Sequence, residues 1–374
     1  MKIVTCFEKH PKNIVGGIHK QMDIICKELL KKNVDIHYVI NKKNKNQNKI
    51  EIIDGIKVHN LRNSINLSPI KIRKKILNVI YSLDLILFVK YFHKLNFDIY
   101  HLWGANNFTG SWAFFSKIIK RKKFVYTTAS SVDCIPGGNP DVPNKLFYKI
   151  YEYGLKKADA VVVLAEYMKK TLLQNYGIKS IVIKSGHPVP KGPFKKDDPP
   201  TILWISRLEE YKRPEMFLKI ARNLKDLRVN FLLIGPNEYM KQKIIDFSNK
   251  QKNFTFIPGI PSDRDIYYYE KASLLVNTST FEGFPNTFIQ AWLYETPVIS
   301  LDIDPDCIIC KEGLGYHAKG NMSDLINNIE DLIKNPSKLR MIGKKCRKYA
   351  IENHDIKKTA EKHYKLYKFL LKMN

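Results

Sequence analysis

Short apolar runs alternate along this chain with longer segments in which apolar residues recur every three or four positions. The first run, at 2–7, is followed by a segment at 18–31 whose apolar positions, among them Ile25 and Leu29, fall on one face of a helix, and then by a second run at 34–40. Apolar runs without polar alternation are typical of strands buried on both faces of a sheet. The chain is therefore predicted to open with a strand, a helix and a parallel strand.

The same alternation continues through most of the sequence. Further strands are expected at 57–61, 99–103, 124–128, 160–164, 181–184, 202–206, 229–234, 254–257, 273–278 and 297–301. Helices are expected at 70–95, 108–120, 143–157, 166–176, 214–224, 239–251, 263–271, 285–294 and, with an interruption at 335–336, from 322 onward. Strands that alternate with helices predict parallel sheets covered by helices.

One segment interrupts the alternation. Residues 185–200 contain five prolines and two glycines among mixed charges, which is typical of a linker between domains. We therefore expect an α/β protein of two Rossmann-like domains, 1–190 and 191–355, whose parallel sheets face a cleft. Ligands of open α/β sheets bind at the carboxyl ends of the strands, so the strand-to-helix loops are where the site is expected.

Composition narrows the class of protein. The 374 residues are 44% hydrophobic and 26% charged, which excludes disordered and collagen-like chains and allows two or three domains with real cores. Six cysteines are too few for a disulfide-stapled secreted scaffold. The N-terminal run is too short for a signal peptide, and no apolar run reaches the roughly 18–20 residues that cross a bilayer. A reduced, cytoplasmic protein is expected.

The chain carries 63 Lys and Arg against 36 Asp and Glu, a formal net charge of +27. This balance favours nucleic acid, nucleotide or sugar phosphates, or an anionic membrane surface as partners. A compositional bias toward Lys, Asn and Ile, visible at 41–50, explains the charge equally well. Residues 70–96, basic at first and then apolar, suit either a helix docking on anionic lipid or a core helix with a solvated end.

The loop after the strand at 273–278 carries the most informative motif. Gly283 permits close approach of the backbone to a ligand, and Pro285 suits the start of a helix. Glu282 lies where a carboxylate binds hydroxyls of a group attached to a bound anion. That anion would be held by the free N–H groups of the first helical turn, those of Asn286, Thr287 and Phe288. An ordinary strand–loop–helix connection with a capping acid is the alternative.

A second motif follows the strand at 202–206. Arg207 and Lys212 lie in a loop that ends where Pro214 starts a helix, and two cations at the carboxyl end of a strand suit a diphosphate. A solvated basic loop is the alternative. Gly16 and Gly17 precede the first helix without forming the dinucleotide fingerprint.

Together these motifs resemble glycosyltransferase family 4 (glycosyl transferases group 1), the retaining, nucleotide-sugar-dependent enzymes of the GT-B fold. The resemblance covers nearly the whole chain, is strongest over 201–301 and is weak over 41–97. The family's signature is Glu, seven residues, Glu, whereas here Glu282 is followed after seven residues by Gln290. An amide still hydrogen-bonds a ribose hydroxyl, so Gln290 would take the place of the ribose-binding Glu.

The resemblance implies a role for each matched position. Arg207 and Lys212 would hold the diphosphate and Glu282 the hydroxyls of the donor sugar, which makes these three the catalytic residues. The other donor-binding residues would be Gly16, Gly17, Gly283, Phe284, Asn286, Thr287, Phe288 and Gln290. No metal or other cofactor is expected.

The implied activity is a hexosyltransferase-type reaction (EC 2.4) between a UDP- or GDP-linked sugar and a hydroxyl of a glycan or lipid-linked acceptor, in cell-surface polysaccharide or glycolipid synthesis. The first domain would bind the acceptor and the second the donor, with the helix in 356–374 packing back on the first. Peripheral attachment to the inner face of the membrane is a further expectation, and nucleic acid is not an expected partner. An impaired nucleotide-sugar-binding homologue and a basic nucleic-acid-binding protein are the alternatives.

The acceptor side offers fewer signals. Many relatives carry a His after the strand at 124–128, where this chain has Ser130 with Asp133 close by. These two residues and His101, at the end of a strand, are the candidate acceptor-side groups, with a purely structural role as the alternative for His101.

Two short motifs imitate metal sites. Asp302 and Asp304 have the spacing of a DxD motif, but they end a buried strand without further ligands nearby. Cys307 and Cys310 have zinc-type spacing without a second pair. Neither motif is expected to bind a metal.

Overall fold

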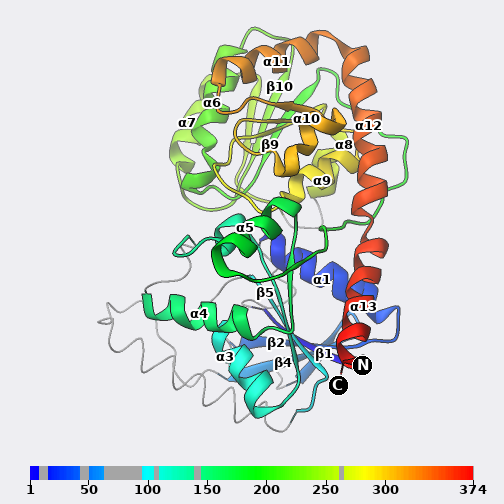
Figure 1. Cartoon of the computed structure of the whole chain (residues 1–374). Coiled ribbons are helices and arrows are strands. Elements are labelled where there is room, and N and C mark those ends of the chain that lie inside the picture. Colours follow the sequence, from blue (N-terminus) through cyan, green and yellow to red (C-terminus); the bar gives the residue numbers. More distant parts are fainter. Residues whose placement is uncertain are drawn as a thin grey trace. The chain divides into compact units, whose positions relative to one another are not determined.

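The computed structural model describes residues 1–7, 16–42, 50–62, 95–104, 109–138, 145–260 and 265–373. The chain divides into a first unit, Met1–Ile183 with Thr359–Asn374, and a second unit, Lys184–Lys358 (Figure 1). Each unit is built on a sheet of mainly parallel strands with helices packed on it, which confirms the predicted α/β class. The proline-rich segment at 185–200 lies at the start of the second unit rather than before it.

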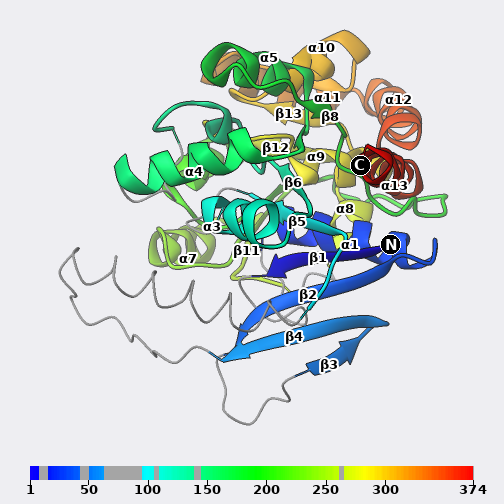
Figure 2. The ribbon, with the colours of Figure 1, turned by 60° about the horizontal axis from the view of Figure 1, so that its bottom comes forward.

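The sheet of the first unit has the strand order β3-β4-β2-β1-β5-β6-β7-β8. Its strands are β1 (Lys2–Phe7), β2 (Asp35–Lys42), β3 (Ile50–Ile53), β4 (Ile56–Arg62), β5 (Ile99–Trp103), β6 (Lys123–Thr127), β7 (Ala160–Val163) and β8 (Ile181–Val182). All pairs are parallel except β3 with β4, which form an antiparallel hairpin at the edge (Figure 2). The sequence analysis missed β3, whose Ile50 and Ile52 are 50% and 71% exposed.

Helices cover both faces of this sheet. They are α1 (Gly17–Leu30), α3 (Thr109–Phe114) with the π-helix η2 (Phe115–Ile119), the 3-10 helix η3 (Ser131–Cys134), α4 (Lys145–Lys157), α5 (Glu166–Tyr176) and α13 (Ile356–Lys372). On one face Tyr100 packs on Trp112 of α3. On the other, Thr5 contacts Met22 of α1. The final helix lies with the first unit from Thr359 onward.

The second unit has six parallel strands in the order β11-β10-β9-β12-β13-β14. They are β9 (Thr201–Ile205), β10 (Asn230–Ile234), β11 (Phe254–Ile257), β12 (Leu274–Asn277), β13 (Val298–Ser300) and β14 (Gly315–His317). The helices are η4 (Glu210–Lys212, 3-10), α6 (Pro214–Asn223), α7 (Lys241–Lys250), α8 (Asp265–Lys271), α9 (Asn286–Leu293), η5 (Pro305–Cys307, 3-10), α10 (Ile308–Glu312), α11 (Met322–Lys334) and α12 (Pro336–His354). The sequence analysis missed β14, η5 and α10.

Apolar faces of α6, α7 and α11 close one side of this sheet, and α8, α9 and α12 lie on the other (Figure 1). The first side is a continuous core in which Trp204 and Phe231 of the strands meet Phe217 of α6 and Leu325 of α11. On the second side Trp292 of α9 packs edge-on against Tyr349 of α12. Burial on both sides fixes the strands, so the loops at their carboxyl ends have a rigid base.

Residues 70–94, which make up nearly all of the helix predicted at 70–95 and of the segment 70–96, lie outside the described residues. Among the helices that are described, none combines the length and the apolar character needed to cross a membrane.

Candidate functional site

The predicted site residues of the second unit lie in two loops at one edge of its sheet. The β9–α6 loop (206–213) contains Arg207 and Lys212, and the β12–α9 loop (278–285) contains Glu282. Because β9 and β12 are parallel neighbours, both loops leave the sheet at its carboxyl edge.

Lys212 and Glu282 join the two loops. The Lys212 ammonium forms an ion pair with Glu282 Oε1, and the side chains are only 11% and 17% exposed. The Ser279 hydroxyl donates to the same carboxylate oxygen at 2.8 Å, and the ammonium lies 4.8 Å from the centre of the Tyr211 ring. The structure thus brings two of the three predicted catalytic residues into direct contact.

Further contacts fix the spacing of these loops. The Tyr211 ring stacks on Phe281, with centroids 4.4 Å apart and planes inclined by 13°. The Thr280 N–H donates to the Tyr211 carbonyl at 2.9 Å, and the Thr278 hydroxyl donates to the Lys212 carbonyl at 2.6 Å. The charged side chains are therefore held by backbone that is itself bonded across the two loops.

Arg207 lies in the same loop but apart from the ion pair. Its side chain is 42% exposed and pairs with Glu209 at 2.7 Å, while Nη2 donates to the Tyr211 hydroxyl at 3.3 Å. These partners all belong to its own loop. The guanidinium can therefore turn toward a ligand without breaking contacts between the loops.

Arg213 is a site residue that the sequence analysis missed. Its Nε donates to the Thr278 carbonyl at 2.6 Å, and its Nη2 pairs with Asp302, beyond the end of β13. Arg213 thus connects the loops that follow three neighbouring strands. Its position beside Lys212 was the only signal for it in the sequence. Asp302, half of the apparent DxD motif, serves as its partner.

The N-terminus of α9 is partly open. Pro285 precedes the helix and supplies no side-chain cap. Among the described residues, the amides of Asn286 and Thr287 have no hydrogen-bond partner, whereas the Phe288 N–H donates to the Pro285 carbonyl at 3.1 Å. The prediction of a free amide is therefore wrong for Phe288, because a tight first turn uses that donor.

The side chain of Asn286 has a partner in the proline-rich segment. His187 Nε2 lies 3.2 Å from Asn286 Oδ1. The backbone of His187 is held on both sides, since its N–H donates to the His354 carbonyl at 2.8 Å and its carbonyl accepts from the Ile356 N–H at 3.1 Å. His187 was also missed, although it is the only histidine in that segment.

Two of the predicted donor-binding residues, Phe284 and Phe288, have buried aromatic rings. Phe284 packs on His354 with ring centroids 4.9 Å apart, and Phe288 packs on Trp292 at 5.8 Å. Both rings belong to the core, so only their backbone can face a ligand, as is also the case for buried Gly283. The packing of these residues in the core holds the β12–α9 loop in place.

Gln290 binds another side chain of the protein. It is 7% exposed, and its Nε2 donates to Asp265 Oδ2 at 3.2 Å, at the start of α8. The amide thereby connects α9 to α8. A carboxylate at this position would face the carboxylate of Asp265.

Gly16 and Gly17 lie in the first unit, where α1 begins. Gly16 has φ of +100°, which side chains rarely adopt, and an added Cβ would meet nothing within 4 Å. No described side chain therefore caps the first N–H groups of α1.

The structure corrects the expectation for His101. This residue is 1% exposed, and its ring nitrogens lie 2.6 Å from the Tyr367 hydroxyl and 2.7 Å from the Thr127 hydroxyl. Burial, with a smaller effect of His363, holds the pKa of His101 well below its ordinary value. The imidazole is a neutral packing group that an acceptor cannot reach.

Ser130 and Asp133 form the cap of the short helix η3. Asp133 is 1% exposed, and its Oδ2 accepts the N–H groups of Ala129 at 2.7 Å and Ser130 at 3.2 Å. The carboxylate therefore shapes this loop and does not face solvent. Of the two, only Ser130 retains partial exposure.

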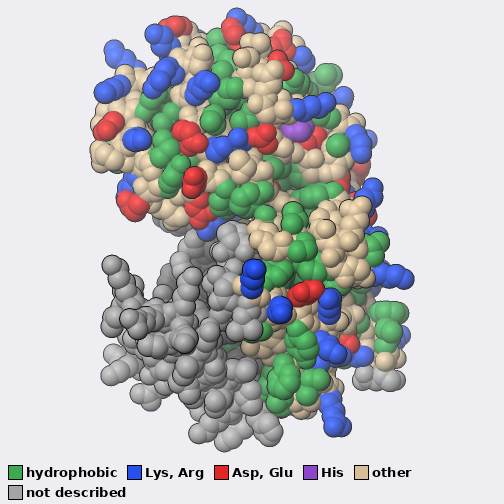
Figure 3. All heavy atoms as spheres, turned by 60° about the vertical axis from the view of Figure 1, so that its left-hand side comes forward, with side chains coloured by type: hydrophobic (Ala, Val, Ile, Leu, Met, Phe, Trp, Pro, Cys, Tyr) green, Lys and Arg blue, Asp and Glu red, His purple; other side chains and the backbone are tan. Residues whose placement is uncertain are grey.

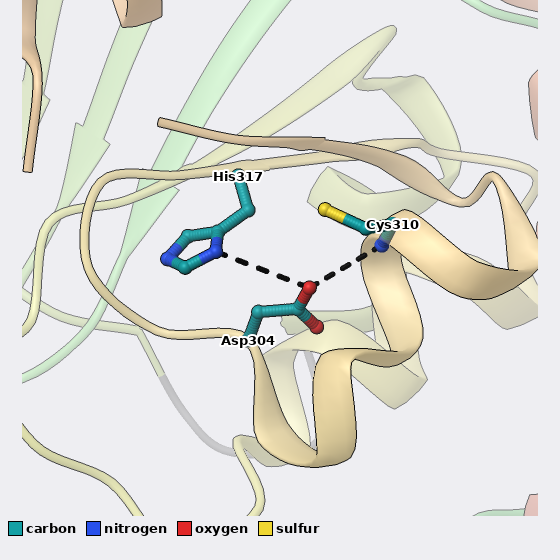
Figure 4. Close-up of side chains that lie close together, drawn as sticks. All are labelled: Asp304, Cys310 and His317. Atoms are coloured by element: carbon teal, nitrogen blue, oxygen red, sulfur yellow. Dashed lines mark hydrogen bonds and ion pairs between the residues drawn. The ribbon is translucent and has the colours of Figure 1, made fainter. Parts of the chain in front are cut away.

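One group of described side chains has the composition of a metal site. Asp304, Cys310 and His317 offer donor atoms that all lie within 4.8 Å of one another (Figure 4). The sequence analysis had set Asp304 and Cys310 aside and had not considered His317. Asp304 and Cys310 lie between β13 and β14, and His317 is the last residue of β14, so none of the three belongs to the β9–α6 or β12–α9 loop.

Residues 189–349 match the family described as Glycosyl transferases group 1, and residues 15–188 match Glycosyltransferase Family 4. A poly(ribitol-phosphate) alpha-N-acetylglucosaminyltransferase of Staphylococcus aureus (strain COL) is 27% identical over 222 residues, which are 56% of this chain and 44% of the relative. An uncharacterized glycosyltransferase of Haemophilus influenzae is 25% identical over 230 residues, 58% of this chain and 64% of the relative. The chain thus covers less than two thirds of the length of these relatives.

Solved structures share the fold over the whole chain. Sucrose-phosphate synthase from Thermosynechococcus elongatus has a TM-score of 0.80 at 16% identity, with 100% of both chains covered. A TarM variant from S. aureus, solved with fondaparinux, alpha-GlcNAc-glycerol and UDP, has a TM-score of 0.78 at 16% identity, over 98% and 99% of the chains. Anabaena HepE with UDP and glucose has a TM-score of 0.71 at 15% identity, again over 98% and 99%.

Proposed function

Since the two family matches place this chain among the group 1 glycosyltransferases of the GT-B fold, we propose that it moves a hexosyl group from a nucleotide-sugar to a hydroxyl of a glycan or lipid-linked acceptor. The observation that carries the proposal is the Lys212–Glu282 ion pair at the carboxyl edge of the second sheet. Two proteins of the same fold were solved with ligands of this kind, HepE with UDP and glucose and the TarM variant with fondaparinux, alpha-GlcNAc-glycerol and UDP.

The donor would bind to the second unit. Lys212 carries three N–H donors, so it can keep Glu282 while it binds a phosphate oxygen. Arg207 turns from Glu209 to the same diphosphate, and the free amides of Asn286 and Thr287 add a helix N-terminus. Glu282, beside these groups, accepts hydrogen bonds from the donor sugar, and Gln290 serves the ribose.

The transfer would proceed with retention. The acceptor oxygen forms a bond to the anomeric carbon on the face from which the nucleoside diphosphate leaves, and the acceptor proton passes to a phosphate oxygen of that leaving group. Fixed cations and amides stabilise the negative charge that develops on the diphosphate, which is the role a bound metal has in other transferases. UDP or GDP is the expected nucleotide.

The acceptor would bind to the first unit. Gly16 and Gly17, at the start of α1, would contribute backbone N–H groups to donor binding. A lipid-linked acceptor also calls for contact with a membrane, and α13 offers a surface for it. The helix has six lysines and one glutamate. Phe369 on the helix and Met373 directly after its end are 60% and 61% exposed. Apolar side chains among lysines suit peripheral binding to anionic lipid on the cytoplasmic side.

Nucleic-acid binding is the weaker alternative. On the face of the second unit shown in Figure 3, Lys and Arg are interspersed with Asp and Glu and form no continuous basic track. A catalytically impaired homologue remains the closer alternative, because Gln290 is engaged with Asp265.

A thermal-shift screen of the purified chain with UDP, GDP, ADP, CMP and the common nucleotide-sugars, with and without EDTA, tests the proposal. A ligand that binds the native state raises Tm. We expect a shift from UDP or GDP that EDTA leaves unchanged, and consumption of the matching nucleotide-sugar when acceptor is added. Nucleotide binding without transfer would favour the impaired homologue. No shift, together with salt-sensitive binding of nucleic acid, would overturn the proposal.

A further inference from the structure

The connection from β13 to β14 gathers three side chains of different chemistry. Asp304 precedes η5, Cys310 lies in α10, and His317 is the last residue of β14. Figure 4 shows the three side chains converging from these elements, with the Asp304 carboxylate between the other two. One donor atom of each residue lies within 4.8 Å of the donor atoms of the other two.

Asp304 is held firmly by backbone donors. Its side chain is 2% exposed. Oδ1 accepts the Ile309 N–H at 2.8 Å and Oδ2 accepts the Cys310 N–H at 3.3 Å. These bonds cap α10 and fix the carboxylate, yet a carboxylate offers about four lone-pair positions, so it has capacity for another partner.

His317 lacks the hydrogen bonds expected of a largely buried imidazole. Its side chain is 17% exposed, and Nδ1 lies 4.0 Å from Asp304 Oδ2, which is too far for a hydrogen bond. Nε2, on the side of the ring away from Asp304 in Figure 4, is buried without a partner among the described residues. Buried polar groups usually have partners. The spacing of Nδ1 from the carboxylate leaves room for an ion between them.

We propose that Asp304, Cys310 and His317 bind a thiophilic divalent cation, Zn²⁺ being the ion that best fits one thiolate, one imidazole and one carboxylate. In a tetrahedral zinc site neighbouring donor atoms lie roughly 3.3–3.6 Å apart, so the three side chains close by about 1 Å onto the ion. On binding, Cys310 releases its proton to solvent and its sulfur bonds the metal, while water takes the fourth position.

The role of this ion is structural and separate from sugar transfer. It links α10 and β14 to the loop after β13, the loop in which Asp302 holds Arg213. A redox function for Cys307 and Cys310 is the competing interpretation. A redox role would need Cys307 as the second thiol, whereas the proposed site does not use Cys307, so the Cys307→Ser variant distinguishes the two interpretations.

Metal titration of the full chain, purified in chelator and then freed of it, tests the site. Added Co²⁺ should give a thiolate-to-cobalt absorption band that saturates at one ion per chain, and Zn²⁺ should displace the band and raise Tm. Cys310→Ser should abolish the band, and His317→Gln should lower the Zn²⁺ affinity at least tenfold. The matched control Cys307→Ser should leave both unchanged.

Metal-free melting curves show whether each variant folds like the wild type, and only variants that do so are compared. Wild-type Zn²⁺ affinity in Cys310→Ser, or loss of the cobalt band in Cys307→Ser, would overturn the assignment. The readout needs neither nucleotide nor acceptor, so it is independent of the proposed transferase activity.

Discussion

Lys212 and Glu282, separated by 70 positions in the sequence, form an ion pair that is largely shielded from solvent and joins the loops after β9 and β12. The Lys212 ammonium and the Glu282 carboxylate are thus paired with each other in the ligand-free protein. Removing one member leaves the other partly buried and uncompensated, whereas removing both leaves no such charge. Binding and stability are therefore coupled at this pair.

Substitution of the pair separates these two effects. We expect Lys212→Met and Glu282→Gln each to lower the free energy of unfolding by roughly 1–3 kcal/mol, the range for leaving a buried polar group without its partner. The double variant should recover most of that loss, yet all three should lose at least a hundredfold in kcat. Urea unfolding and steady-state kinetics provide the measurements. Strictly additive stability losses would contradict the coupling.

Arg207 should behave differently, because its exposed side chain contacts only its own loop. Arg207→Ala is expected to change unfolding by less than about 0.5 kcal/mol while it raises KM for the nucleotide-sugar and lowers kcat. Lys219→Ala, at an exposed position of α6, is the matched control and should leave both constants unchanged. Equal activity of the two variants would remove Arg207 from the donor site.

Gln290→Glu restores the residue of the family signature but places it against Asp265. Two carboxylates at this separation repel, so the variant should be less stable by about 1–2 kcal/mol at pH 7 and should recover as the pH falls and one carboxyl takes up a proton. Adding Asp265→Asn should rescue stability at pH 7. Urea midpoints at pH 7 and pH 5 measure the effect, and a variant as stable as the wild type at both would disprove the contact.

The first unit should lose stability in acid through its buried histidines. Trp103 stacks against His101 at 4.4 Å and His363 at 5.3 Å. Burial lowers the pKa of His363 to about 4. In the unfolded chain His363 has the ordinary histidine pKa of about 6.5, so on acidification the unfolded chain binds a proton before the folded chain does. The free energy of unfolding is therefore at its full value above about pH 6.5 and decreases as the pH falls toward 4.

His363 alone should lower the free energy of unfolding by about 2 kcal/mol between pH 7 and pH 5. Urea unfolding followed by tryptophan fluorescence at several pH values measures the loss, and His363→Leu should flatten the profile over that interval. An unchanged slope in the variant would assign the acid sensitivity to other groups, such as His59, whose pKa is also lowered to about 4.

Membrane binding can be tested on α13. Vesicles of phosphatidylcholine with about a third phosphatidylserine should retain the wild-type chain in flotation, and Phe369→Ser with Met373→Ser should reduce the bound fraction several-fold. Neutral vesicles should bind neither protein. Retention of the double variant at the wild-type level would exclude the exposed face of α13 as the docking surface.

Much of the fold follows from apolar periodicity, because each buried parallel strand is a run of apolar residues flanked by a helix. The exceptions have local causes. The strand β3 is partly exposed and has no continuous apolar run. The turn residues Asp54 and Gly55, both with positive φ, are the sequence signal that indicates its hairpin. The strand β14 has three residues and begins at Gly315, so it resembles a loop in sequence.

Side-chain partners were harder to predict than elements. The carboxyl-edge loops with Lys212 and Glu282 were expected, but their direct contact depends on the order of β9 and β12 in the sheet. His101 was a candidate ligand-binding residue because its strand ends at the expected edge. Its partner Tyr367 is 266 positions away in the sequence, and no local pattern reports such a contact.

The hairpin strand β3 has a practical consequence for handling this protein. Among the described strands β3 is the last one at one edge of its sheet, and Ile50 and Ile52 are largely exposed. Such an edge is a template on which a second molecule can extend the sheet, and a strand of four residues with Glu51 between the isoleucines limits this only in part. Slow, concentration-dependent aggregation should therefore begin here, and Ile52→Lys should delay it.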